Sequence, residues 1–324
     1  MLDDWEILHG LYPSSAADAT LDAGGDGLIN LHEYWCDTDP LMPDGSNTLL
    51  SVASRSVDDR IRGVDPTIAI PRFVNYFPNG SNGVFQLNTN FWARDLDLSC
   101  VSVWNTSDNP GGRTATLITR KHVVMAAHWP WSIYKFCDTN GIVQTRTVVK
   151  SEPISDDLLL GRLNEPLPDS FKPARISTTN LLSYLATGKY IPALCLNQEK
   201  GATVLELAAL DAEATRTGGG HFFHYGHTSH TNLVSTQRCN VRRAAVDGNS
   251  GCPVFVVAGN KLVLLFAIHL MNRGIETWTN SWGPMLPFRL EVVQQKINEW
   301  EGDDANQYQV VPFDFSSFGG ISYQ

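Results

Sequence analysis

The segment Asp247–Pro253, of sequence Asp-Gly-Asn-Ser-Gly-Cys-Pro, contains the residue best suited to covalent chemistry. Glycines lie close on both sides of Ser250 and a proline closes the segment, which predicts a tight loop that exposes one hydroxyl. Because Gly248 has no Cβ, its backbone N–H can turn towards a developing oxyanion. We therefore identify Ser250 as the candidate nucleophile, and the N–H groups of Gly248 and Ser250 as the candidate oxyanion hole.

A serine hydroxyl is a weak nucleophile at neutral pH and needs a general base, with an acid behind the base to orient it. Residues 116–128 predict two β-type runs that end in two alanines and a histidine, so His128 is the candidate base. Asp157 stands directly before the apolar run 158–163, where a strand would hold its carboxylate at a fixed depth. Asp157 is the candidate orienting acid, and Asp156 is its rival.

Taken in chain order, these stretches resemble the motifs of the chymotrypsin/trypsin-like serine protease family, in its bacterial type. Residues 126–128 resemble the family's histidine motif, residues 157–160 its aspartate motif, and residues 248–253 its serine motif. Three motifs in the family's order are far more specific than any one of them.

The resemblance implies an all-β fold, a chymotrypsin-like double β-barrel with a C-terminal helix. The first barrel would carry His128 and Asp157, the second would carry Ser250, and the active site would lie between them. The implied activity is that of a serine endopeptidase, which hydrolyses peptide bonds through an acyl-enzyme. Its partner would be a protein or peptide substrate, and catalysis would need no cofactor.

Three residues depart from the family pattern. Asn249 stands where many animal members have an aspartate that pairs with a new N-terminus, so activation by that ion pair is not expected. Trp129 follows the histidine where animal enzymes have a half-cystine, and Cys252 replaces the usual glycine. None of these changes touches the proton-transfer chemistry.

Two residues bear on the choice of substrate. His269 lies on the strand that lines the first specificity pocket in this family, and it resembles the histidine of glutamate-selective bacterial and glutamine-selective viral relatives. Its imidazole could hydrogen-bond a Glu or Gln side chain, and the alternative is that it points elsewhere on the strand. Ala244 offers no carboxylate for Arg or Lys, so a trypsin-type preference is not expected.

Near the N-terminus, residues 22–33 fit a twelve-residue EF-type calcium loop and resemble the repeats of thrombospondin type 3 and dockerin units. Gly24 removes the usual third-position carboxylate, and the alternative is a turn without an ion. The predicted ligands of a structural calcium ion are Asp22, Asp26, Leu28 (through its carbonyl), Asn30 and Glu33.

These patterns divide the chain into a calcium-binding module over 1–45, a linker over 46–69, a protease domain over 70–301 and a C-terminal tail over 302–324. Within the third part, residues 286–301 predict a closing helix with one apolar face.

The histidines at 221, 224, 227 and 230 invite a metal interpretation. We reject it, because a spacing of three sends neighbouring strand residues to opposite faces.

The composition is that of a turn-rich globular protein: 324 residues, 43% of them hydrophobic, with 26 glycines and 17 prolines. A net charge of -10 argues against nucleic acid as a partner. No stretch is long and apolar enough to predict a membrane span. The six cysteines contain no C-x-x-C spacing, and their pairing cannot be assigned from the sequence.

No secretory signal is visible at the N-terminus. The family resemblance and the calcium loop nevertheless imply a secreted or periplasmic protein, so we expect Met1 to be an internal or truncated start. The competing function is a catalytically inactive, protease-like binding module outside the cell. Hydrolysis of small esters or autoproteolysis alone is a third alternative.

Overall fold

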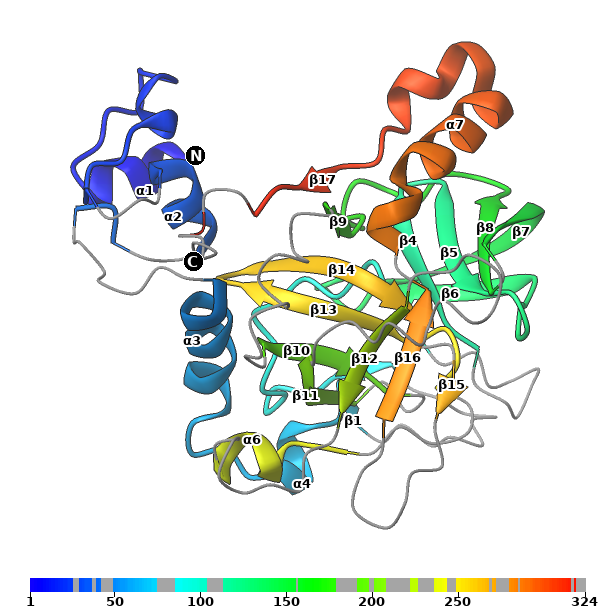
Figure 1. Cartoon of the computed structure of the whole chain (residues 1–324), viewed down its shortest axis with the longest axis horizontal. Coiled ribbons are helices and arrows are strands. Elements are labelled where there is room, and N and C mark those ends of the chain that lie inside the picture. The colour runs from blue at the N-terminus through cyan, green and yellow to red at the C-terminus, as the bar shows by residue number, and fades with distance from the viewer. Residues whose placement is uncertain are drawn as a thin grey trace, which may run out of the picture.

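The fold is known from a computed structural model (Figure 1). It describes residues 1–25, 29–36, 39–41, 49–74, 85–103, 113–155, 157–178, 191–197, 201–207, 222–226, 236–243, 249–267, 270–271, 280–284, 286–315 and 318. Most of the regular structure in these residues is β-strand, with few helices, which agrees with the expected all-β class.

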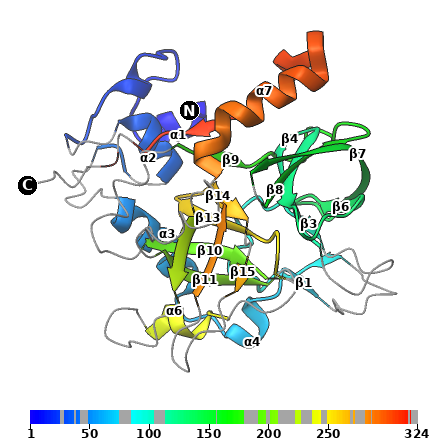
Figure 2. The same cartoon turned by 45° about the vertical axis from the view of Figure 1, so that its right-hand side comes forward.

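One sheet has six antiparallel strands and carries the histidine and aspartate motifs at strand ends. Its order is β3 (Ser102–Val103), β6 (Ile133–Cys137), β7 (Val143–Ser155), β8 (Leu158–Leu163), β5 (His122–Ala126) and β4 (Ala115–Thr119). A bridge between Val101 and Thr116 and a 2.7 Å hydrogen bond from the Leu117 N–H to the Cys100 carbonyl join its two edges. The sheet therefore curls back on itself, as Figure 2 shows.

The other large sheet has nine strands and contains the serine loop. Its order is β15 (Leu270–Met271), β16 (Asn280–Pro284), β12 (Phe222–Gly226), β11 (Ala202–Leu207), β10 (Ile191–Leu196), β13 (Pro253–Ala258), β14 (Lys261–Ala267), β9 (Arg175–Ser177) and β17 (Pro312–Phe313). A separate pair joins β1 (Phe73–Val74) to β2 (Gln86–Leu87). Pairing is antiparallel except where β9 meets β14 and β17.

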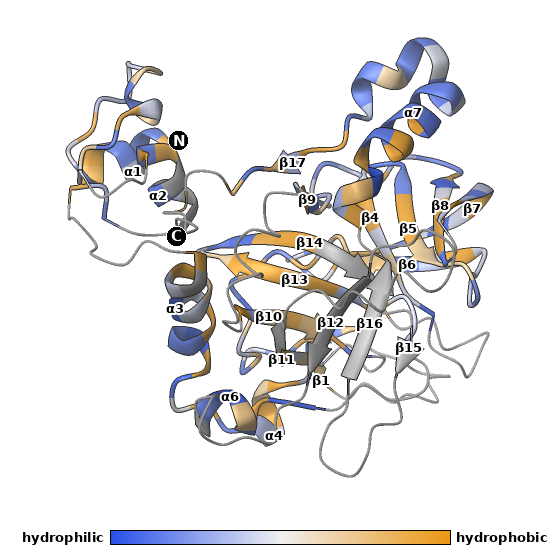
Figure 3. Ribbon diagram, in the orientation of Figure 1, coloured by the Kyte–Doolittle hydropathy of each residue, from blue (hydrophilic) through white to orange (hydrophobic). Residues whose placement is uncertain are grey.

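After the serine loop, the chain forms the antiparallel hairpin β13–β14. Gly259, with φ of 58°, makes the turn, and all six residues of β13 are buried. Figure 3 shows both strands coloured as hydrophobic along much of their length. One core cluster contains residues from both large sheets, including Val124 of β5 and Phe255 of β13, so the two sheets pack against each other.

Short helices surround the sheets. They are α1 (Asp3–Leu8), η1 (Asp18–Thr20), α2 (Asn30–Cys36), α3 (Leu49–Ile61), α4 (Pro66–Ala69), α6 (Thr236–Asn240), η3 (Leu286–Arg289), α7 (Leu290–Glu301) and η4 (Gly302–Gln307). The first three lie at one end of the molecule, within the predicted calcium-binding module (Figure 1).

The structure differs from the linker expected over 46–69, because α3 and α4 occupy most of it. One face of α3 is apolar and fully buried: Leu49, Val52, Ala53, Val57 and Ile61 are each at most 2% exposed. Ser56 adds a polar tie, since its hydroxyl accepts a 2.8 Å hydrogen bond from the N–H of Gly259 in the β13–β14 turn. This segment is therefore part of the core.

The expected tail over 302–324 also belongs to the fold where it is described. β17 extends the nine-stranded sheet by pairing Pro312 with Ile176. Phe313, Phe315 and Phe318 are almost completely buried and contact one another in a second core cluster. Because these three phenylalanines are buried, this segment belongs to the hydrophobic core and is not a tail on the surface of the protein.

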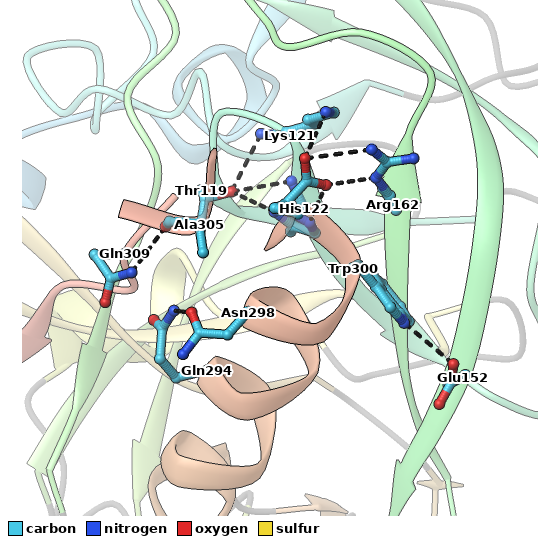
Figure 4. A network of polar contacts seen from close by, with 11 residues as sticks. Thr119, Lys121, His122, Glu152, Arg162, Gln294, Asn298, Trp300, Ala305 and Gln309 are labelled. Carbon is cyan, nitrogen blue, oxygen red and sulfur yellow. Dashed lines mark hydrogen bonds and ion pairs between the residues drawn. The ribbon is translucent and has the colours of Figure 1, made fainter. Parts of the chain in front are cut away.

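The predicted closing helix is confirmed as η3 followed by α7, with Val293 and Ile297 buried in the core. Its last residue, Glu301, contacts Lys121 and Arg162 beside the six-stranded sheet, and Figure 4 labels both partners. Lys121 Nζ donates to Glu301 Oε2 at 2.7 Å, and Arg162 donates through Nε to Oε1. The Nε2 of His122 lies 3.2 Å from Oε1 but is not aligned for a hydrogen bond.

Burial and these contacts together set the protonation states of Glu301 and His122. Burial by itself raises the pKa of Glu301, but hydrogen bonds from Arg162 and Lys121 outweigh it and lower the pKa to about 2. Burial lowers the pKa of His122 to about 4, so its imidazole stays neutral near pH 7. The helix is thus anchored to β5 and β8, the strands that lead to His128 and Asp157.

Candidate active site

Strand pairing brings the histidine and aspartate motifs together. β5 ends at Ala126, β8 begins at Leu158, and these two residues are partners in the antiparallel register. Just beyond them, the N–H of Ala127 donates to the carbonyl of Asp157 at 3.0 Å. The pairing of the two strands therefore places His128 and Asp157 side by side. As expected from the sequence, Asp157 lies directly before a strand.

The serine loop packs against the end of the same sheet. The N–H of Cys252 donates to the carbonyl of Asn249 at 2.9 Å, which closes a tight turn around Ser250. Gly251 has a φ of 84°, and a Cβ there would lie only 2.7 Å from the carbonyl oxygen of Thr114. Only glycine combines this backbone conformation with so close an approach.

The three predicted residues form one continuous chain of hydrogen bonds. His128 Nε2 lies 2.9 Å from Ser250 Oγ. His128 Nδ1 lies 2.8 Å and 2.7 Å from the two carboxylate oxygens of Asp157. The backbone N–H of His128 also donates to Asp157 Oδ1 at 2.7 Å, so the carboxylate fixes both the backbone and the ring of the histidine.

Burial differs along this chain in a way that suits proton transfer. The Asp157 side chain is 5% exposed, whereas the His128 side chain is 40% exposed and borders solvent. Burial lowers the pKa of His128, so a neutral imidazole predominates at neutral pH. With Nδ1–H donating to Asp157, Nε2 is left to accept the proton of the serine hydroxyl.

Several predicted residues lie outside the described part of the chain. They are the oxyanion donor Gly248, the specificity residues Ala244 and His269, the rival acid Asp156, and the predicted calcium ligands Asp26 and Leu28. The histidines at 221, 227 and 230 also fall there, while His224 lies on β12. Of the candidate oxyanion donors, the described residues contain the N–H of Ser250.

In the predicted calcium loop, the structure describes Asp22, Asn30 and Glu33. Asn30 is buried and ties the loop together, since its Nδ2 donates to the Asp18 carbonyl at 2.9 Å and its Oδ1 accepts from Ala23 N–H at 3.2 Å. Glu33 is fully buried on α2. Within the described residues, no three side chains of His, Cys, Asp or Glu gather as metal ligands.

Asp18, which the sequence did not single out, is a further acidic group at this loop. Its side chain is buried, its Oδ2 accepts from Tyr12 N–H at 3.0 Å, and its Oδ1 accepts no hydrogen bond from any residue that the structure describes. A buried carboxylate oxygen without a donor fits a nearby cation. Asp18 lies four residues before the loop, so the EF-type spacing gives no signal for it.

The sequence also missed Arg113 and Thr114, which contact the segments that follow His128 and Ser250. Arg113 lies over the rings of Trp129 and Trp131, with its Cζ 4.4 Å from each ring centroid. Thr114 Oγ1 lies 3.5 Å from the Sγ of Cys252, one of the family departures noted in the sequence. Within the part of the chain that the structure describes, no disulfide joins any two of Cys100, Cys137, Cys195, Cys239 and Cys252.

Comparison with known proteins finds no protein-family model that matches this chain, and no curated protein that matches it. No helix within the described residues is long and apolar enough to cross a membrane.

Proposed function

We propose that the chain is a serine endopeptidase in which Ser250 is the nucleophile, His128 the general base and Asp157 the orienting acid. The observation that carries this proposal is the unbroken hydrogen-bond path from the Asp157 carboxylate through His128 to the Ser250 hydroxyl. A base that is hydrogen-bonded to a nucleophile on one side and to an orienting acid on the other is the geometry that nucleophilic catalysis requires.

Peptide-bond hydrolysis follows from this arrangement in two stages. His128 Nε2 takes the proton of Ser250 as Oγ attacks the peptide carbonyl carbon, and the same proton then passes to the leaving amine. Water next enters, loses a proton to His128 and releases the acid from the acyl-enzyme, which restores the serine hydroxyl. Throughout, Asp157 keeps the Nδ1–H tautomer and stabilises the imidazolium.

Two further features of the resemblance belong to the proposal. The N–H groups of Gly248 and Ser250 would stabilise the oxyanion of each tetrahedral intermediate. Each large sheet would form one barrel of a chymotrypsin-like pair, with the site where the two meet. In support, the curled six-stranded sheet supplies His128 and Asp157, and the nine-stranded sheet follows directly from Ser250.

For substrate choice, we propose a protein or peptide cleaved after Glu or Gln. The support is the sequence, with His269 on the expected pocket strand and no carboxylate at Ala244. A neutral imidazole can donate to the side-chain oxygen of either residue. Cleavage of paired peptides that differ only in Glu, Gln, Lys or Leu before the cut would rank the four side chains directly.

A structural calcium ion at the N-terminal loop is a separate proposal. Asp22, Asn30 and Glu33 would hold it together with Asp26 and the carbonyl of Leu28, and the buried Asp18 Oδ1 supports a cation there. The ion would neutralise acidic side chains and order the loop, with no part in catalysis. Calcium should raise the melting temperature of the wild type and leave that of an Asp22→Ala, Glu33→Gln variant unchanged.

The activity is tested by labelling the chain with a fluorophosphonate, which reacts with activated serine hydroxyls. Wild type should be labelled on Ser250, while Ser250→Ala and His128→Ala should show no labelling. Ser170→Ala, which removes an exposed serine, is the matched control and should label like wild type. A folded wild type without label, or a label that survives Ser250→Ala, would overturn the proposal.

A further inference from the structure

Arg113 contacts the two tryptophans that closely follow the catalytic histidine in the chain. Its guanidinium carbon lies 4.4 Å from the ring centroids of both Trp129 and Trp131, and Trp129 is the residue directly after His128. A guanidinium over an indole face is held by the ring quadrupole, and the attraction strengthens when water is excluded. The contact therefore joins Arg113 to the segment that carries His128.

Hydrogen bonds among the described residues do not explain why the charge of Arg113 lies here. Its Nε and Nη1 are buried and have no hydrogen-bond partner in that part of the chain, so the two indole faces are the main compensation for its desolvation. Trp131 is itself anchored, because its backbone N–H donates to the hydroxyl of Tyr134 at 3.0 Å and that hydroxyl donates to Met125 Sδ at 3.3 Å. The stack thus has a rigid base in the core of the six-stranded sheet.

The next residue, Thr114, contacts the other catalytic loop. Its carbonyl oxygen is the atom that a Cβ at Gly251 would meet at 2.7 Å, and its Oγ1 lies 3.5 Å from Cys252 Sγ. Two consecutive residues therefore touch the loops on either side of the site. Arg113 meets the histidine segment and Thr114 meets the serine turn.

From this juxtaposition we propose that Arg113 is a positioning residue. Its stack on Trp129 and Trp131 holds the His128 side chain within hydrogen-bond distance of Ser250. The backbone of residues 113–114 sets the distance between the serine turn and the segment after His128. The guanidinium of Arg113 fixes the position of that segment. This inference rests on the proposed protease function. It requires that the 2.9 Å contact between His128 Nε2 and Ser250 Oγ depends on the stack of Arg113 on the two tryptophans.

The test uses Arg113→Met, which keeps most of the aliphatic stem and removes the charge, and Arg113→Lys, which keeps a cation. Misplacing a catalytic group by about 1 Å costs on the order of 10²-fold in rate. We expect fluorophosphonate labelling of Ser250 to slow by about 10- to 100-fold in Arg113→Met, with partial recovery in Arg113→Lys. Lys150→Met is the control, because it removes another cation over an indole, Lys150 over Trp300, and should label like wild type.

A second readout does not depend on reactivity. The proton on His128 Nδ1, held between the ring and Asp157, should give a sharp downfield NMR signal in wild type and a broadened or shifted one in Arg113→Met. The pKa of His128, followed by the same method, should differ between the two proteins. A purely structural role for Arg113 would change the melting temperature and leave the signal and the pKa of His128 as they are.

The outcomes separate this inference from the proposed function. An Arg113→Met protein with wild-type labelling and a wild-type His128 signal overturns the positioning role. If wild type is not labelled, the protease proposal fails, and the NMR comparison still decides whether the stack orients His128. Should Arg113→Met not fold, Trp129→Leu removes the more exposed face of the stack, and the same loss of labelling and signal is required of it.

Discussion

At the scale of single residues, the alignment of Ser250, His128 and Asp157 depends on small residues as well as on these three. Gly251 lets the serine turn lie against the carbonyl of Thr114, and Ala126 lies next to the same turn. The sequence predicted the nucleophile, base and acid because each sits in a short motif whose chemistry is local. It missed Arg113, because a stack on rings 16 and 18 residues away leaves no spacing signal.

Gly251→Ala should damage both stability and activity. The substitution meets a φ of 84° and a backbone oxygen 2.7 Å from the new Cβ, so we expect a loss of about 3 kcal/mol or more and little labelling of Ser250. Gly141→Ala is the matched control, since φ there is 82° but nothing lies within 4 Å of a Cβ. It should cost about 1 kcal/mol. Equal losses of denaturant stability in the two variants would show that the close approach is unimportant.

At the scale of elements, α7 is anchored through Glu301 to Lys121 and to Arg162 of β8. The sequence predicted this helix from the apolar residues on one of its faces. It predicted a linker where α3 lies, although Leu49, Ala53 and Val57 recur there at helical spacing. Serine, aspartate and arginine on the outer face of α3 hid that pattern, and only the sheet beneath shows why its inner face is buried.

Glu301→Gln should loosen α7 from the sheet. The change leaves Lys121 and Arg162 without the carboxylate that they share, and that carboxylate is 1% exposed. Breaking a deeply buried pair costs roughly 3–5 kcal/mol, and we expect about 2 kcal/mol because Arg162 is partly exposed. Glu299→Gln, on the exposed side of the same helix, should leave the denaturation midpoint unchanged. A Glu301→Gln midpoint equal to wild type would rule out this role.

Acid should destabilise the protein in two steps through the same contact. His122 has its pKa lowered from 6.5 to about 4, and Glu301 has its pKa lowered from 4.5 to about 2. In both ranges the unfolded chain binds more protons than the folded protein, so stability falls as the pH falls. Urea denaturation between pH 7 and pH 3 should show the decline, and Glu301→Gln should abolish its lower step. A midpoint independent of pH would contradict these protonation states.

At the scale of the whole molecule, the two large sheets pack against each other, and α3, residues 312–315 and Phe318 pack against the nine-stranded sheet. α3 covers β10 and β13 from the N-terminal side, and the phenylalanines after β17 cover the second core cluster from the C-terminal side. The all-β class was implied by the resemblance of the three motifs to those of the serine protease family. The parallel pairing of β9 and β17 joins residues far apart in the chain, and nothing in the local sequence predicts it.

Truncation should therefore reveal where the folded unit begins. Removing residues 1–45 should leave the melting temperature of the remainder and the labelling of Ser250 largely intact, because α3 is retained. Removing residues 1–69 should prevent cooperative folding, because it strips Val57 and Ile61 from the main core and three more apolar residues from the second cluster. Calorimetry of both proteins makes the comparison. A fully stable chain beginning at residue 70 would contradict the place given to α3.

The most direct test of the central claim is to map the peptide bonds that the protein cuts in a denatured protein mixture. Wild type and Ser250→Ala are incubated in parallel, and new N-termini are identified by mass spectrometry. New termini should appear with wild type alone, concentrated after Glu or Gln. No new termini from a folded, calcium-loaded wild type, or the same termini with Ser250→Ala, would contradict the assignment of Ser250, His128 and Asp157 as a proteolytic site.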